Sequence, residues 1–258
     1  MAETVKIEIG ENHVGEITLN RPENLNTFTL ALASDLNAAL LQLDTDPSVR
    51  VVILKGAGKA FCVGIDVGDF FGKSSMQYRE WIECMETPLL RISKMRTPVI
   101  AQVHGVAAAN GAGLVAACDL AISADTARIG LTAINVGLNC VGPVIPVTRS
   151  VGRKRAMEML LFGELIKAPA ALEMGLINKV VPAEDLEMET RRWAAVLAAK
   201  SPIAVQIAKS AFYNAADLDY DKAFAFMNEA FARLCATEDA KEGVSAFLEK
   251  RKPTWTHK

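Results

Sequence analysis

The stretch AANGAGLVAACD, residues 108–119, has a backbone suited to a binding site but almost no side chains that do chemistry. It follows an apolar segment typical of a strand and precedes one typical of a helix. A second junction of this kind, ILKGAGKAFCVGID at residues 53–66, follows another apolar run. If neighbouring strands carry both junctions, backbone N–H groups from the two loops can converge on one oxygen. Such an oxyanion hole stabilises negative charge that develops on a carbonyl.

Two interpretations of these small residues stay open. Glycine and alanine let a ligand approach the backbone closely, and they also let a helix pack closely on a sheet. GAGK at residues 56–59 superficially suggests a phosphate-binding loop, which requires G-x-x-x-x-G-K-[ST]. Ile53 and Ala60 stand where the first glycine and the hydroxyl of that motif should be. The sequence therefore argues against nucleotide hydrolysis.

The composition excludes several classes of function. The 258 residues are 51% hydrophobic, and 28 basic against 30 acidic residues leave a net charge of −2, so one large domain with a substantial core is expected and a nucleic-acid partner is not. Five single cysteines and three scattered histidines predict no metal site, and they predict reduced thiols in a cytoplasmic or mitochondrial-matrix compartment. The start of the chain predicts neither a signal nor a transit peptide. No uncharged apolar run is long enough to span a membrane.

The elements that must position the two loops follow from hydrophobic periodicity. VKIEI and VGEITL predict a hairpin, and VRVVILKG, PVIAQVHG and LAISA predict further strands. Two helices are predicted from apolar stripes. The first stripe contains Leu32, Leu36, Leu40 and Leu43, and Thr29 or Thr27 could cap its helix. The second contains Trp81, Met85, Leu89 and Ile92, and Pro88 predicts a bend in its helix. Alternating strands and helices predict an α/β fold. We expect a core over residues 1–195 and a helical region over 196–258 that packs on a neighbouring subunit.

The order of several segments resembles that of the enoyl-CoA hydratase/isomerase, or crotonase, family over essentially the whole chain. These segments are ITLNRPENLN, GKAFCVGID, TPVIAQVHGVAAANGAGLVAACDLAIS, VGRKRAMEMLLFGELI, ALEMGLINKVVP and AFLEKRKPTW. The cysteine-containing loop and the tail look similar to a branch named only "enoyl-CoA hydratase domain-containing". The resemblance implies a crotonase-type spiral of ββα units with a C-terminal helical region, and a homotrimer or homohexamer. It also implies an acyl-CoA thioester as ligand, with coenzyme A as part of the substrate and no other cofactor.

The resemblance also assigns site residues. The two backbone donors to the thioester oxygen would be Ile65 and Asn110, and Gly111 could share the second role. Many family members have glycine where this chain has Asn110. The implied coenzyme A contacts are Leu25, Lys59, Val63, Ile65, Asp66 and Val67, together with Phe247 and Lys250 from a C-terminal helix that closes over the nucleotide.

Hydratases of the family use two glutamates, and both are absent here. Their positions are Gly113 and Ala133, and neither residue can move a proton. Asn139 could orient a water, and a Cys140 thiolate could attack carbon, although a buried cysteine is more often an inert small hydrophobe. His104 could act as a base or make a structural hydrogen bond.

Three functions therefore stay open. The first is an enzyme that acts on an acyl-CoA thioester through an enolate, with very slow hydration of simple 2-enoyl-CoA substrates. The second is a non-catalytic acyl-CoA binder or assembly partner. The third is a conventional enoyl-CoA hydratase whose acids come from elsewhere.

Overall fold

Within the described part of the chain, the main sheet has six strands, and all but one of them are parallel. The computed structural model describes residues 4–258; of Asp69 it describes the backbone alone. The prediction about a signal or transit peptide concerns the start of the chain, part of which lies outside the described residues. The strand order is β1 (Val5–Ile9), β2 (Val14–Leu19), β3 (Val51–Gly56), β4 (Val99–Val103), β6 (Leu120–Ala124) and β9 (Lys179–Val181). β1 and β2 pair antiparallel, which confirms the predicted hairpin. The following neighbours are parallel.

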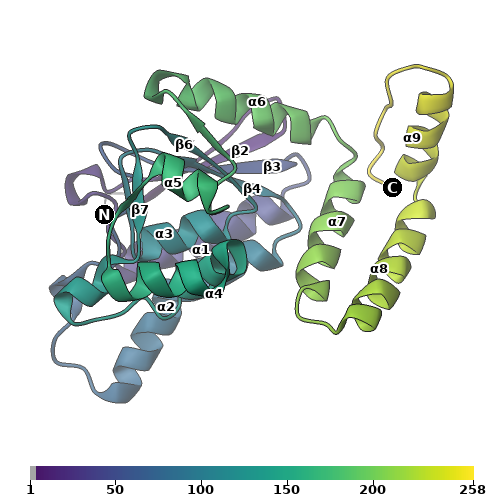
Figure 1. The fold of residues 1–258 in the computed structure, drawn as a ribbon. Coiled ribbons are helices and arrows are strands. Elements are labelled where there is room, and N and C mark those ends of the chain that lie inside the picture. Colours follow the sequence, from purple (N-terminus) through teal and green to yellow (C-terminus); the bar gives the residue numbers. More distant parts are fainter. Residues whose placement is uncertain (1–3) are drawn as a thin grey trace.

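A smaller sheet and a set of helices surround the main sheet. The smaller sheet contains β5 (Val106–Ala108), β7 (Arg128–Gly130) and β8 (Ile166–Lys167). The first helices are α1 (Leu30–Thr45), α2 (Ser75–Lys94), α3 (Asn110–Ala117), α4 (Val144–Phe162), α5 (Ala168–Glu173) and α6 (Leu186–Ala198). Helix α6 covers one face of the sheet, and α1 and α3 lie on the other face (Figure 1). This arrangement buries the sheet on both faces, as its apolar strands require.

The helix signals of the sequence are found in the structure. The Thr29 side chain accepts a hydrogen bond from the Leu32 amide and caps α1, and the predicted apolar stripes of α1 and α2 are buried. α2 begins with a capping box between Ser74 and Gln77, and Pro88 lies inside it. α4 is interrupted at Gly152, which has φ 75° and ψ 168°. Among residues 4–258 no helix is both long and apolar enough to cross a membrane.

Three C-terminal helices extend away from the sheet (Figure 1). They are α7 (Pro202–Ala215), α8 (Tyr220–Cys235) and α9 (Glu238–Leu248). The predicted division after residue 195 falls inside α6, which packs on the sheet and buries Ala198 near its end. The helices therefore change from packing on the sheet, as α6 does, to packing mainly on one another after the turn at residues 199–201, before α7 begins.

A buried ion pair fastens α7 to the sheet. Lys209 Nζ lies 2.7 Å from Asp119 Oδ2, and the two side chains are only 6% and 15% exposed. Asp119 also accepts hydrogen bonds from the Val99 amide at 2.7 Å and from the Tyr213 hydroxyl at 3.0 Å. Lys209 donates a second bond to the Thr97 carbonyl at 2.9 Å. Asp119, just before β6, is therefore a structural acid.

We expect Lys209→Met to lower the free energy of unfolding by about 3–5 kcal/mol, because it leaves the Asp119 carboxylate buried without its counter-charge. Urea denaturation followed by circular dichroism measures the change. The matched control is Lys222→Met, which removes an exposed ion pair with Asp219 and should change stability little. Equal effects of the two substitutions would contradict a structural role for the Asp119–Lys209 pair.

Candidate functional site

Two loops leave the same edge of the sheet side by side. β3 and β4 are adjacent and parallel, so their carboxyl ends meet at one edge, which is the usual place of sites in such sheets. The Phe61 amide donates to the His104 carbonyl at 3.1 Å, and the Cys62 amide donates to the Val106 carbonyl at 3.2 Å. The Ala108 amide returns a bond to the Cys62 carbonyl at 2.9 Å. The predicted meeting of the two junctions is confirmed.

The two loops approach so closely that side chains are excluded between them. A Cβ at Gly105 would overlap the carbonyl of Lys59, and a Cβ at Gly111 would overlap the carbonyl of Cys62. At Gly64, which has φ 102°, a Cβ would lie 2.9 Å from Ala109 Cβ. The small residues are thus required for packing, and that packing brings the peptide units 64–65 and 109–110 together. Close packing and close approach of a ligand to the backbone, the two interpretations of these small residues, are therefore compatible.

The Ile65 amide is directed away from its neighbouring chain segment. Phe28 and Ile65 form an isolated parallel bridge, in which the Phe28 amide donates to the Gly64 carbonyl at 2.8 Å and the Asp66 amide donates to the Phe28 carbonyl at 2.7 Å. Ile65 lies between Gly64 and Asp66, which make the two bonds to Phe28, so the N–H of Ile65 points to the side of its segment that faces away from Phe28. The Ile65 N–H is therefore not used in the pairing with Phe28.

The Asn110 amide lies at the start of α3, where N–H groups have no acceptor within the helix. Ala109 turns the chain into the helix with φ 49° and ψ −112°, a conformation that costs a non-glycine residue about 1–3 kcal/mol. The Asn110 side chain is buried and donates to the Met85 carbonyl at 3.2 Å. The asparagine that departs from the family's glycine thus points its amide group into the core, and its backbone N–H stays at the helix end, where negative charge is favoured. Gly111 is the second helical residue and adds another such amide.

The two positions at which the resemblance implies glutamates have different surroundings. At Gly113 a Cβ would lie 2.7 Å from Leu89 Cδ2 and 2.8 Å from Pro143 Cβ, so no side chain fits without movement. Ala133 lies in the short 3-10 helix Thr132–Val136.

The three candidate replacements differ in their surroundings. Cys140 is buried; burial raises the pKa of its thiol, and a hydrogen bond from the Ala133 amide lowers it to a smaller degree, so the group is a thiol at neutral pH. Asn139 is exposed. His104 lies with Nε2 3.0 Å from the Gly58 carbonyl oxygen, and burial lowers its pKa. This histidine makes the structural hydrogen bond.

The residues assigned to coenzyme A form one group and one outlying pair. Leu25, Lys59 and Val67 are exposed near the loops, and Val63, Ile65 and Asp66 are partly buried. Phe247 and Lys250 are at the end of α9, which packs against α7 and α8 and lies apart from the sheet edge in Figure 1. Within one chain the structure does not bring this pair to the other residues.

Asp66 has a structural role at the first loop. It accepts a hydrogen bond from the Gly68 amide at 3.1 Å and lies 3.2 Å from Arg21. The Gly68 bond is the main cause that lowers the pKa of Asp66, with the Arg21 contact adding to it. Asp66 is therefore ionised at neutral pH and caps the turn that follows Ile65.

Asn26 positions the first loop and was not singled out from the sequence. Its side chain is fully buried, and Nδ2 lies within 3.2 Å of the carbonyl oxygens of Ala57, Ala60 and Phe61. Oδ1 accepts from the Arg21 amide at 2.9 Å. One amide group thus fixes the backbone that leads to Ile65.

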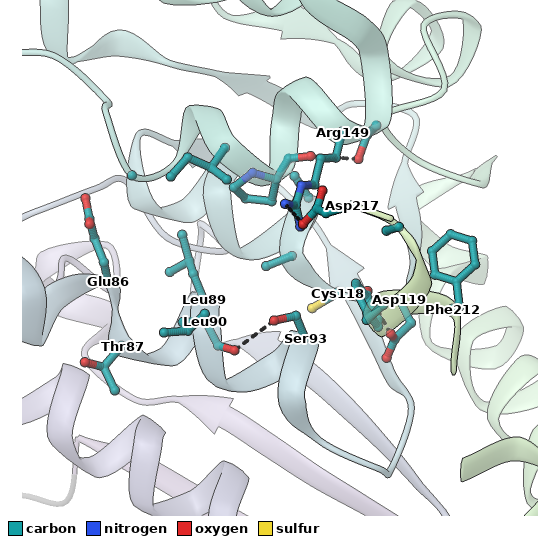
Figure 2. A pocket seen from close by; sticks show the side chains of 18 of the residues that line it. Glu86, Thr87, Leu89, Leu90, Ser93, Cys118, Asp119, Arg149, Phe212 and Asp217 are labelled. Carbon is teal, nitrogen blue, oxygen red and sulfur yellow. Dashed lines mark hydrogen bonds and ion pairs between the residues drawn. The ribbon is translucent and has the colours of Figure 1, made fainter. Parts of the chain in front are cut away.

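Glu86 was also not singled out. A cavity of about 740 Å³ lies between α2, the end of α3, α4 and α7. Figure 2 shows Glu86 at one end of the cavity, with Asp119 and Phe212 at the other. Glu86 Oε1 is buried without a hydrogen-bond partner among the described residues. The signal in the sequence is weak: Glu86 follows Met85 at the edge of the apolar stripe of α2.

We expect Gly111→Ala to destabilise the protein by about 1–3 kcal/mol or more, because the new methyl group must separate the two loops. Urea denaturation measures the effect. Gly243→Ala is the matched control: it is also helical, and its Cβ would lie 3.3 Å from the Trp255 ring. Since alanine favours helix, the control should be neutral or slightly stabilising. A neutral Gly111→Ala variant would show that the loops are not held in close contact.

Comparison with known proteins agrees with this architecture. The Enoyl-CoA hydratase/isomerase family model matches residues 10–258. The chain is 36% identical over 245 residues to human "Enoyl-CoA hydratase domain-containing protein 3, mitochondrial", covering 95% of this chain and 81% of that protein. It is 34% identical to "Probable enoyl-CoA hydratase echA8" of Mycobacterium tuberculosis, covering 99% of both.

Solved structures show the same fold. The crystal structure of an enoyl-CoA hydratase from Mycobacterium smegmatis is similar with a TM-score of 0.95 at 39% identity, covering 98% of both chains. That of human enoyl Coenzyme A hydratase domain-containing protein 3 gives a TM-score of 0.92 at 34% identity, covering 98% of this chain and 100% of that one. The expected crotonase-type fold is confirmed, and the chain belongs to the enoyl-CoA hydratase/isomerase, or crotonase, family.

Proposed function

We propose that this protein binds acyl-CoA thioesters and stabilises an enolate formed from them. The observation that supports the proposal is the close approach of Gly64 and Ala109, the residues that directly precede the two proposed donors, Ile65 and Asn110. One amide is directed away from its neighbouring segment, and the other lies at a helix start. Two such donors are worth most when they face charge that develops during the reaction.

Coenzyme A lies, in this proposal, along Leu25 and the segment from Lys59 to Val67, and it is part of the substrate. Phe247 and Lys250 of a neighbouring copy would close over the nucleotide, and the assembly proposed is a homotrimer or homohexamer. Large exposed apolar side chains on the C-terminal helices support such an assembly; they include Phe212, Phe224, Phe231, Phe247 and Leu248. The free thiols and the "mitochondrial" name of the human relative support a cytoplasmic or matrix location.

The chemistry proposed for the site is enolate chemistry, with simple hydration as a slow reaction. Adding water across a double bond requires groups that deliver and remove protons, and the positions of the family's pair hold Gly113 and Ala133. Cys140 does not replace them as a nucleophile in this proposal, because it is held as a buried thiol.

The oxyanion hole predicts a difference between two ligands that differ by one oxygen. Butyryl-CoA has the thioester carbonyl, and S-butyl-CoA lacks it. We expect butyryl-CoA to bind at least about tenfold more tightly, since each of the two hydrogen bonds contributes about 0.5–1.5 kcal/mol net and about 1.4 kcal/mol corresponds to a factor of ten. Isothermal titration calorimetry with both ligands, and with free coenzyme A as the reference, measures the difference. If butyryl-CoA bound no better than S-butyl-CoA, the two amides would not face a carbonyl oxygen.

Hydration of crotonyl-CoA should be slower than in a family member that has both glutamates. Each missing acid–base group is expected to cost about 10²–10⁴-fold in rate. Loss of the enoyl-thioester absorbance measures turnover, and thermal stabilisation by the same ligand measures binding. Stabilisation with little turnover is the expected result. Turnover equal to that of the two-glutamate enzyme would favour a conventional hydratase with acids from elsewhere.

A further inference from the structure

Glu86 lies on the turn of α2 that is fixed to the candidate oxyanion donor. The preceding residue, Met85, offers its carbonyl to the buried Asn110 side chain at 3.2 Å. Leu89, one turn further along α2, packs against Gly113. α2 therefore contacts both the residue that supplies the second amide and the position of one missing glutamate.

The Glu86 carboxyl lies against the loop that follows Ala133, the position of the second missing glutamate, and leads into α4. A Cβ at Gly142 would overlap the carboxyl group of Glu86, so the carboxyl lies directly on the backbone at that position. The next residue, Pro143, is the one that fills the space beside Gly113. Two residues before Gly142, the Cys140 thiol accepts a hydrogen bond from the Ala133 amide. A carboxyl from a different helix thus reaches the neighbourhood from which both family acids are absent.

Glu86 is the one charged side chain of this cavity without an opposite charge among the residues that the structure describes. Glu83, on the same helix, pairs with Arg79; Asp119 pairs with Lys209; Arg149 pairs with Asp217. Glu86 Oε1 has no partner in the described chain, and burial raises the pKa of the group. The Glu86 carboxyl accepts one hydrogen bond, from the Gly142 amide, which lowers its pKa less than burial raises it. Burying a carboxyl that has no counter-charge and one unpaired oxygen costs stability, and carboxyls with perturbed pKa values occur preferentially where proton transfer is needed.

We propose that Glu86 is the catalytic residue that moves the proton at C2 of the bound acyl-CoA. This proposal rests on the thioester site of the preceding subsection. The Glu86 carboxylate takes a proton from C2, the electron pair of the C–H bond forms a double bond between C2 and the thioester carbon, and the π pair of the carbonyl moves to its oxygen, where the Ile65 and Asn110 amides hold the enolate. The carboxyl returns a proton to carbon, and no oxidant or further reactant is consumed. One carboxyl suffices for this exchange, whereas hydration in the family uses two.

The test is exchange of the C2 hydrogens of butyryl-CoA in D₂O, followed by proton NMR. We expect the wild-type protein to replace these hydrogens with deuterium. Glu86→Gln should slow the exchange by about 10²–10⁴-fold, the usual share of a general base. The matched control is Glu80→Gln, the same chemical change at an exposed position of α2, and it should exchange like the wild type. The wild-type rate should rise with pH until the Glu86 carboxyl is ionised.

The free energy of unfolding of Glu86→Gln, measured by urea denaturation, tests whether this variant is folded. A carboxyl with a raised pKa in the folded chain contributes stability below its unfolded pKa, and this contribution is lost as the pH rises through the folded pKa. Glu86→Gln is therefore expected to be at least as stable as the wild type at pH 8, with the difference shrinking toward pH 4. A variant less stable than the wild type at pH 8 would show that Glu86 is structural and would overturn the proposal.

Calorimetric binding of butyryl-CoA separates the two proposals. Equal exchange by the wild type and Glu86→Gln, or binding without exchange by the wild type, would overturn the role of Glu86 and leave the thioester site intact. Absence of butyryl-CoA binding by the wild type would overturn the proposed function, and the role of Glu86 with it.

Discussion

The close approach of the segments 59–65 and 104–111 is the constraint on which the rest of the structure depends. Backbone meets backbone there, and even a methyl side chain is excluded at Gly105, Gly111 and Gly64. The contact fixes where the chain turns from β4 into α3, and it holds Ala109 in an unfavourable conformation. Since the contact places two peptide units next to each other, the same packing that builds the fold also builds the candidate binding site.

Buried polar side chains hold the segments on either side of this contact in place. Asn26 satisfies three carbonyl oxygens of the first loop from one side. On the second loop, the Asn110 side chain bonds to α2. At the far end of α3, Asp119 and Lys209 fasten the sheet to α7. The site is therefore supported by elements that are distant in sequence, which suits a site whose donors are backbone groups and must be positioned by the fold.

Periodicity and glycine placement predicted most of the fold and part of the candidate site. The hairpin of β1 and β2, the buried stripe from Leu32 to Leu43 and the two loops at one edge all follow from local patterns. Periodicity identifies which residues are buried but not what they touch, so Asn26 and Glu86 were missed. Whether Asn110 directs its side chain to the core depends on α2, which lies 25 residues away in sequence. The predicted division after residue 195 falls inside α6, whose amphipathic pattern does not reveal whether a sheet or another helix covers it.

The fit between Gly142 and Glu86 has a consequence for comparing relatives. Any side chain at position 142 would occupy the space of the Glu86 carboxyl, so the two positions cannot vary independently while this arrangement is kept. We expect members of the family that keep a glutamate against this loop to carry glycine at the position of Gly142; with a larger residue there, the carboxyl must turn away from the loop or be absent. Residue types at these two positions therefore report whether a carboxyl faces the loop, which the small-residue loops cannot report because close packing requires them in any case.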